Sequence, residues 1–309
     1  TAETVCFEIG GDPLPEDEEH DAEFEEEVIE AVSLPVAPAP RALPAPQLTS
    51  RPAIPASTTS PIAPRQPLAE ESLDDRYAVL DRKMRFVSLP EAIREQFLWG
   101  ARPVVIAGTH GKTTTTALTG WVLTHGGIDP SVLVGGIARN FGDAGSSYRV
   151  GSGREFVIEG DEYDSAFFDK TAKFLKYLPD IAVINNIEFD HADIYADLDA
   201  VRLAFRRLVN LVPRKGLLLL GADSPDAVAL RPRAFSRVET FGLSEGADWQ
   251  AHDLVAKATT THFAVRRGGA PYGQFEVPLL GAHNVRNALA AMAIATDCGL
   301  SAERIASGL

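Results

Sequence analysis

The sequence predicts an α/β fold with a doubly wound, mostly parallel sheet, and three observations lead to this prediction. Short apolar runs of the kind that lie buried in parallel sheets recur from residue 104 onward. Helical stretches separate several of these runs, which is the alternation expected of a doubly wound domain. A glycine-containing loop joins the first run to the first of these helical stretches. In folds of this class, ligands bind at the carboxyl ends of the strands.

Five short runs of mostly apolar residues are the predicted strands. They lie at residues 104–107, 131–134, 156–158, 181–184 and 217–220. The helices between them have recognisable ends, because the helix expected at 113–125 stops before two glycines and the helix expected at 198–212 stops before Pro213. A last helix is expected at 284–298.

A first helix is predicted just before the sheet begins. Leu89, Ile93 and Phe97 recur at helical spacing, and Ser88 is a suitable N-cap for them. Residues 73–100 are therefore expected to form a linker and this helix.

A small antiparallel β addition is predicted between residues 236 and 280. Runs with β character lie at 238–241, 261–266 and 274–277, and Gly-rich turns separate them. We expect these runs to form a small antiparallel addition to the fold.

The first part of the chain has a different composition from the rest. Residues 1–40 hold 13 of the 43 acidic side chains and no Lys or Arg, and residues 35–67 hold ten of the 21 prolines. Such segments bury too little apolar surface to offset the entropy of ordering. We therefore predict a disordered arm at residues 1–72 and a folded domain at residues 101–309.

Composition also excludes several classes of protein. Outside the acidic stretch, 30 acidic residues face 29 basic ones, so no basic excess is present to bind nucleic acid. The apolar run at 217–220, like every other apolar run in the sequence, is far shorter than the roughly 20 residues of a membrane span. No secretory signal is recognisable, which predicts a cytoplasmic location. Cys6 and Cys298 have no metal-binding spacing, and we expect them to be ordinary thiols.

The loop after the first strand has the residues of a phosphate-binding loop. Glycines allow backbone amides to approach phosphate oxygens, a lysine reaches the terminal phosphates, and a hydroxyl holds magnesium. Ile106 stands where the strict pattern has its first glycine, but the strand before the loop and the helix after it supply the required context. The residues predicted to bind the nucleotide here are Gly108, Thr109, His110, Gly111, Lys112, Thr113 and Thr114.

Two polar segments follow other predicted strands and so reach the same edge of the sheet. The acidic segment 159–164 offers Glu159 and further carboxylates, which are the oxygen ligands that magnesium prefers, although such a segment can also be a solvated turn. The segment 185–193 brings His191 to the edge, although its acidic residues can also be helix caps beside a solvated histidine.

The start of the last helix is the fourth polar segment. His283, Asn284 and Asn287 lie within or next to its first turn. A side-chain amide can pair with the donor and acceptor edge of adenine, and a purely structural helix start is the alternative.

The four motifs GTHGKTTTT, EGDEYD, NNIEFDHAD and GAHNVRNALAA, in this order, resemble the central domain of the Mur ligases. The resemblance covers residues 86–309. Within the family, the amino-acid sequence at residues 162–170, 140–142 and 189–193 is most similar to that of the members that recycle a murein tripeptide. The members that add L-alanine share the phosphate loop and differ after the acidic motif.

The resemblance implies an amide-forming reaction that uses ATP and Mg²⁺. ATP phosphorylates the carboxylate of UDP-N-acetylmuramate, and the amine of L-Ala-γ-D-Glu-meso-diaminopimelate attacks the acyl phosphate. The implied catalytic residues are Lys112, Glu159 and His191, and the implied metal ligands are Thr113, Glu159 and His191. His283, Asn284 and Asn287 are implied to hold adenine or ribose. Several Mur ligases use a carbamylated lysine where Phe205 stands here, so no carbamate is expected.

Two departures from the family pattern keep other functions open. Family members carry a UDP-binding domain before this region and a peptide-binding domain after it, and we expect the C-terminal ligase domain to be absent here. An ATP-binding fragment without catalysis and an L-alanine-adding ligase therefore remain alternatives. A ligase of the folylpolyglutamate synthase type is a weaker alternative, because such ligases share the general fold of the Mur ligases but not the sequence EYDSAFFDK.

Overall fold

The computed structural model describes residues 7–8, 81–142, 144–189 and 194–309. The region from Arg85 to Leu309 belongs to one compact unit, which also includes the short strand β1 (Phe7–Glu8). The rest of the predicted arm at residues 1–72 lies outside the described residues, and its predicted disorder stays a prediction. Among the described residues, no helix has the length and apolar character needed to cross a membrane.

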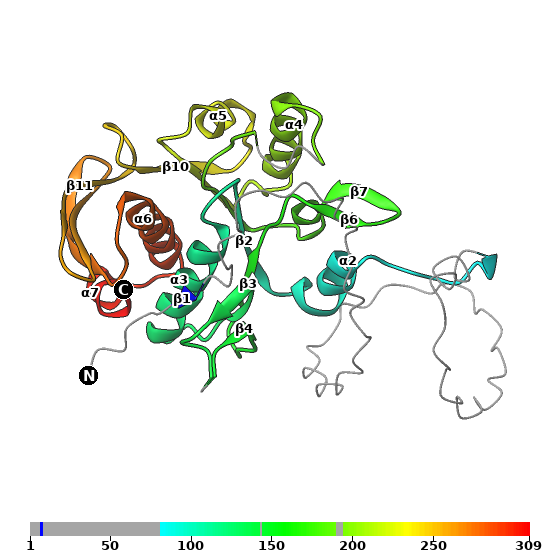
Figure 1. The fold of residues 1–309 in the computed structure, drawn as a ribbon, viewed down its shortest axis with the longest axis horizontal. Coiled ribbons are helices and arrows are strands. Elements are labelled where there is room, and N and C mark those ends of the chain that lie inside the picture. Colours follow the sequence, from blue (N-terminus) through cyan, green and yellow to red (C-terminus); the bar gives the residue numbers. More distant parts are fainter. Residues whose placement is uncertain (1–6, 9–80, 143, 190–193) are drawn as a thin grey trace, which may run out of the picture. The chain divides into compact units, whose positions relative to one another are not determined.

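One large mixed sheet runs through this unit (Figure 1). Its strands follow the order β1-β3-β5-β2-β8-β9-β10-β11-β12-β13, and β4 pairs with the outer side of β3. The strands after β1 are β2 (Arg102–Ala107), β3 (Ser131–Ala138), β4 (Ser146–Arg149), β5 (Glu155–Glu159), β8 (Ile181–Ile184), β9 (Leu217–Gly221), β10 (Arg237–Gly242), β11 (Trp249–Ala256), β12 (Thr261–Arg267) and β13 (Ala270–Val277). A separate hairpin consists of β6 (Asp164–Ala166) and β7 (Asp169–Ala172).

Helices and short helical turns connect the strands. They are α2 (Leu89–Ile93), the π-turn η1 (Arg94–Leu98), α3 (Lys112–His125), the 3₁₀ turn η2 (Lys173–Lys176), α4 (Leu198–Val209), α5 (Pro225–Val228), the 3₁₀ turn η3 (Arg231–Arg233), α6 (Ala282–Asp297) and α7 (Ala302–Gly308).

The strand order reverses at β2. From β2 the chain first builds β3 and β5 on one side and then places β8 and β9 on the other. The strands from β3 to β10 on this path pair in parallel. A crevice for ligands is expected where the order reverses, at the carboxyl end of β2.

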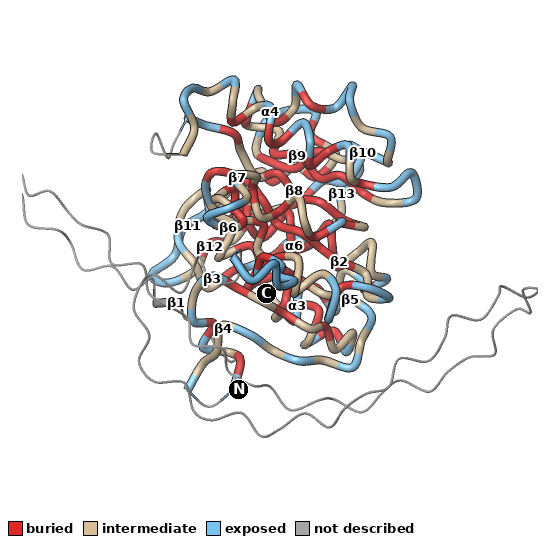
Figure 2. Tube along the Cα trace, turned by 90° about the vertical axis from the view of Figure 1, so that its right-hand side faces the viewer, coloured by how far each residue is buried: buried red, intermediate tan, exposed pale blue. Residues whose placement is uncertain are grey.

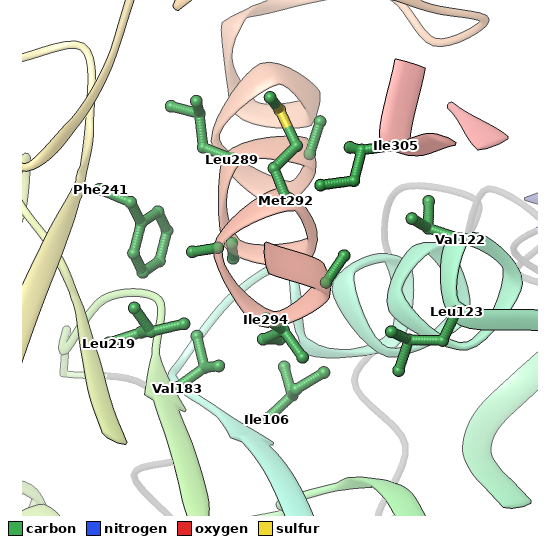
Figure 3. Packing of buried hydrophobic residues seen from close by; sticks show 14 of the residues in the cluster. Ile106, Val122, Leu123, Val183, Leu219, Phe241, Leu289, Met292, Ile294 and Ile305 are labelled. Atoms are coloured by element: carbon green, nitrogen blue, oxygen red, sulfur yellow. The ribbon is translucent and has the colours of Figure 1, made fainter. Parts of the chain in front are cut away.

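The central strands are buried on both faces, as the continuous apolar runs predict (Figure 2). Alternate side chains enter two separate cores. Ile106, Val183 and Leu219 point towards α6 and join the core that α3, α6 and α7 cover, as Figure 3 shows. Val105 and Leu220 enter the opposite core, which contains α4. Helices on both faces confirm the doubly wound prediction.

The antiparallel region differs from the sequence prediction in two strands, β10 and β11. β10 pairs in parallel with β9 and so belongs to the parallel part of the sheet, whereas β11, β12 and β13 pair antiparallel and confirm the predicted antiparallel addition at the sheet's end. β11 was not predicted. Its first half buries only alternate residues, Trp249 and Ala251, and a register shift interrupts it between His252 and Val255, so no apolar run marks it.

The first helix confirms the predicted cap. The Ser88 side chain accepts a hydrogen bond from the Glu91 amide, and the Glu91 carboxylate bonds back to Ser88. After Ile93 the chain continues as the π-turn η1, which takes more residues per turn. This change of period buries Leu98, whereas Phe97 is half exposed.

The carboxyl end of β9 leaves no room for a side chain at Gly221. An added Cβ would lie 1.9 Å from the carbonyl oxygen of Asn185, so the backbone would have to shift. We expect Gly221→Ala to lower the free energy of unfolding by about 2–3 kcal/mol, as over-packing usually does. Urea denaturation followed by circular dichroism measures this change.

Gly308→Ala is the matched control. Its added Cβ would meet its nearest neighbours at 3.4 Å and beyond, which is ordinary contact. We expect its stability to be unchanged or raised by less than about 1 kcal/mol, because alanine restricts the unfolded chain. An equal loss of stability in both variants would contradict close packing at Gly221.

Candidate functional site

Two glycines define the path of the loop between β2 and α3. Gly108 has a φ of +130°, and a Cβ there would lie 2.9 Å from the backbone nitrogen of Asn185. Gly111 is the left-handed N-cap of α3 with a φ of +82°, and a Cβ there would lie 2.6 Å from Oδ1 of Asn287. Only glycine fits these positions without displacement. The loop therefore lies directly against the segment after β8 and the first turn of α6.

The first turn of α3 opens onto this loop. It begins at Lys112 and includes Thr113 and Thr114. The amides of a first helical turn have no partners within the helix and attract anions, so this end of α3 suits phosphate groups. The helix itself is buried on most sides between the sheet and α6.

The Lys112 side chain lies inside the loop. Its ammonium group donates to the carbonyl oxygens of Gly108, at 2.8 Å, and Thr109, at 3.1 Å. It also forms an ion pair with the Glu162 carboxylate, with Nζ–O distances of 2.9 and 3.0 Å. Burial raises the pKa of Glu162, while the positive charge of Lys112 opposes this effect. The acidic segment after β5 is thus joined to the phosphate loop.

Thr113 and Glu159 form the oxygen-rich part of the site. The Thr113 hydroxyl donates to Glu159 Oε1 at 3.0 Å, and the Gly135 amide donates to Oε2 at 2.8 Å. A hydroxyl and a carboxylate are ligands that suit Mg²⁺, so these two side chains fit the predicted metal site. Within the described residues, no group of three or more acidic, His or Cys side chains could hold a metal ion. His191, the third predicted ligand, lies outside the described residues.

The segment after β8 forms the second wall of the site. The Asn186 side chain accepts a hydrogen bond from the His110 amide at 2.8 Å, and its backbone carbonyl accepts one from the Thr109 amide at 3.1 Å. The His110 ring lies 3.6 Å from the Glu188 carboxylate, and both side chains are exposed. Thr109 and His110 are thereby fixed at the carboxyl edge of β2, as predicted.

A chain of polar side chains links the segment after β8 to α6. The Asn185 amide donates to the Thr115 hydroxyl at 3.2 Å, and that hydroxyl donates to Asn287 Oδ1 at 3.1 Å. The Asn287 amide donates to Asn284 Oδ1 at 3.2 Å. Asn284 in turn donates to the carbonyl of Leu280 at 2.9 Å. Asn284 and Asn287 therefore reach the site region but also stabilise the start of α6.

A cavity of about 510 Å³ lies beside the phosphate loop. It combines apolar walls with amides and charged groups, the usual character of a small-molecule site. The lining residues are His110, Gly111, Asn185, Asn186, Ile187, Glu188, Asp223, Ser224, Pro225, Phe241, His283, Arg286 and Asn287. His283 and Asn287 belong to the predicted nucleotide site. Asn284 does not line the cavity but accepts the hydrogen bond from the Asn287 amide.

Sequence reasoning missed the charged pair at one side of this cavity. Asp223 follows β9 and forms an ion pair with Arg286 of α6. Its carboxylate also accepts hydrogen bonds from the amides of Leu243 and Ser244 after β10. These bonds keep the pKa of Asp223 below its usual value, although burial acts in the opposite direction. The sequence signal that could have indicated Asp223 is its position two residues after the buried strand β9.

Comparisons with known proteins agree with this geometry. The Mur ligase middle domain matches residues 106–295. The UDP-N-acetylmuramate–L-alanyl-gamma-D-glutamyl-meso-2,6-diaminoheptandioate ligase of Haemophilus influenzae is 38% identical over 226 residues, which cover 73% of this chain and 48% of that protein. The UDP-N-acetylmuramate–L-alanine ligase of Salinibacter ruber is 41% identical over 221 residues, 72% of this chain and 43% of that protein. The chain thus spans about half the length of the curated relatives it matches.

A solved structure shows the same similarity in three dimensions. The UDP-N-acetylmuramate:L-alanyl-gamma-D-glutamyl-meso-diaminopimelate ligase from Neisseria meningitides superposes with a TM-score of 0.70 at 37% identity, and the match covers 78% of this chain and 75% of that one. The match to the middle domain spans the phosphate loop, the acidic segment, the segment after β8 and the start of α6. With these motifs gathered at one edge of the sheet, the chain belongs to the Mur ligase family.

Proposed function

We propose that this protein is part of an ATP-dependent ligase that joins UDP-N-acetylmuramate to the tripeptide L-Ala-γ-D-Glu-meso-diaminopimelate through an acyl phosphate. One observation carries the proposal: the phosphate loop, the Thr113–Glu159 pair and the adjoining cavity lie together at the carboxyl edge of β2. This arrangement suits phosphoryl transfer, in which positioning and neutralisation of charge supply most of the catalysis.

Each part of the site has a proposed role. Lys112 and the amides from Gly108 to Thr114 hold the β- and γ-phosphates of ATP. The cavity beside the loop receives the nucleoside, where His283, Asn284 and Asn287 provide polar partners for adenine or ribose. The cavity is large enough for a nucleoside and opens directly onto the loop through His110 and Gly111.

Thr113, Glu159 and His191 are the proposed Mg²⁺ ligands. The metal would neutralise negative charge between the γ-phosphate and the substrate carboxylate. Thr113 and Glu159 already lie within hydrogen-bonding distance of each other, so little rearrangement is needed to bring both oxygens to one ion.

The tripeptide is proposed as the amine substrate because of residues 162–170. This segment contains β6 and the first two residues of β7, and this part of the hairpin carries charged and aromatic side chains. Phe167 and Phe168 at its turn are 51% and 42% exposed, and Lys170 pairs with Asp164. An exposed surface of this kind suits a large charged peptide better than a single alanine. L-Alanine is the second candidate for the amine substrate, because the UDP-N-acetylmuramate–L-alanine ligase of Salinibacter ruber is 41% identical to this chain.

The remaining proposals follow from these substrates. We place the reaction in peptidoglycan recycling in the cytoplasm, with UDP-N-acetylmuramate and the tripeptide as small-molecule partners. Neither nucleic acid nor a membrane is needed as a partner. Residues 101–309 act in this proposal as the ATP-binding central domain.

Lys112→Ala should weaken the binding of ADP. The change removes the lysine that donates to the carbonyls of the phosphate loop, and a lost hydrogen bond to a charged group corresponds to about 10- to 150-fold in Kd. Isothermal titration calorimetry measures this effect. Lys170→Ala is the control, because Lys170 is exposed and pairs only with Asp164 among the contacts found in the described residues. Equal affinity for the wild type and the Lys112 variant would refute the phosphate-loop assignment.

The amine substrate can be tested with the complete protein, ATP and UDP-N-acetylmuramate. We expect the release of ADP to depend on the tripeptide much more strongly than on L-alanine. The opposite preference would identify an L-alanine-adding ligase. Thermal stabilisation by ATP with no product from either amine would favour a nucleotide-binding protein without catalysis.

A further inference from the structure

The ammonium group of Lys112 is fully occupied in this structure. It has three hydrogens to donate, and they face the carbonyls of Gly108 and Thr109 and the Glu162 carboxylate. Both members of the ion pair are shielded from water, since the side chain of Lys112 is 13% exposed and that of Glu162 is 4% exposed. The lysine must therefore exchange at least one of these partners before it can bind a phosphate oxygen.

Glu162 is the fixed member of the pair. The carbonyl oxygen of Glu162 accepts a hydrogen bond from the Tyr195 hydroxyl at 2.7 Å. On either side of it, the Asp161 carbonyl accepts from the Phe174 amide and the Tyr163 carbonyl accepts from the Lys173 amide. These bonds hold the backbone of the acidic segment against η2. Lys112, with four rotatable bonds in its side chain, is the more mobile partner.

The electrostatics of this pair work against an incoming nucleotide. A carboxylate near the phosphate loop repels the phosphates, and it also competes with them for the same ammonium group. Interactions between charges at such distances are strong where water is excluded. Removing only one partner of a buried pair leaves an uncompensated charge, so Glu162 resists the transfer of Lys112 to a ligand.

We propose that Glu162 is a positioning residue, which holds Lys112 in the empty phosphate loop as a counter-ion and competes with the nucleotide phosphates for it. The proposal rests on the nucleotide-binding function proposed above. Glu162 keeps the cationic side chain folded and aimed into the loop when no ligand is present. It also limits the affinity for ADP, so that nucleotide exchange is easier than in a loop without this carboxylate.

Glu162→Gln tests the proposal, because glutamine keeps the shape and an acceptor oxygen but removes the charge. We expect the variant to bind ADP about 5- to 20-fold more tightly than the wild type, in calorimetric titrations with and without Mg²⁺. A purely structural role predicts unchanged or weaker binding in the variant, and either result would overturn the proposal. If the wild-type chain itself fails to bind ADP, the proposed function fails instead.

Asp161→Asn is the matched control on the same loop. The Asp161 carboxylate lies 2.9 Å from the Lys173 ammonium group and 2.9 Å from the Tyr163 amide, and it forms no ion pair with Lys112 among the contacts found in the described residues. We expect its loss of charge to change the affinity for ADP less than about 2-fold. If Asp161→Asn raised the affinity for ADP as much as Glu162→Gln, any carboxylate of the acidic segment would weaken ADP binding, and the proposal would be wrong.

Protein stability gives a second, independent test. Lys112→Met leaves the Glu162 charge buried without its cationic partner, whereas the double variant Lys112→Met/Glu162→Gln removes both charges. The double variant should therefore have a higher Tm than the Lys112→Met variant, although it carries one more substitution. A lower or equal Tm would show that the two side chains are not coupled in this way.

Discussion

The whole site depends on the close approach of three backbone segments at the carboxyl edge of the sheet. The backbone of Asn185, which follows β8, lies between Gly108 of the phosphate loop and Gly221 at the end of β9. A Cβ at either glycine would meet Asn185 backbone atoms at 2.9 Å or less, so the three strands can end side by side only without these side chains. Because β2, β8 and β9 are buried on both faces, their ends cannot move apart independently. The positions of Thr109, His110 and the Asn185 side chain follow from this packing.

Acidic and amide side chains gather at this edge of the sheet. Three of its parallel strands bring an acidic or amide side chain there: Glu159 ends β5, Asn185 directly follows β8, and Asp223 lies two residues after β9. Glu159 and Glu162 face the two residues that begin α3, while Asp223 faces Arg286 near the start of α6. The edge thus combines two helix starts with carboxylates that orient the nearby cationic and hydroxyl groups. The negative charge balances Lys112 and Arg286 in the absence of a ligand and leaves the helix amides for an anion.

Much of this arrangement could be predicted from the sequence, because buried parallel strands carry an unbroken apolar signal. The runs at 104–107 and 217–220 lie within β2 and β9, and 181–184 coincides with β8. β11 escaped prediction because its polar face interrupts the signal, and β10 was grouped with the wrong strands because pairing direction has no local signature. The local sequence also does not indicate which charged side chains pair with each other. The pairing of Glu162 with Lys112 and of Asp223 with Arg286 depends on strand order, which brings residues 50 and 63 positions apart into contact.

We propose that the carboxyl edge around Asn185 is a nucleotide site in which Lys112 moves from Glu162 to a phosphate. A crystal structure of the chain with Mg²⁺ and a non-hydrolysable ATP analogue tests it most directly. We predict phosphates against the amides of Gly108–Thr114, the nucleoside in the cavity between His110 and Arg286, and the Lys112 ammonium group on a phosphate oxygen. A nucleotide bound elsewhere, or bound at the loop with Lys112 still paired only to Glu162 and the loop carbonyls, would contradict it.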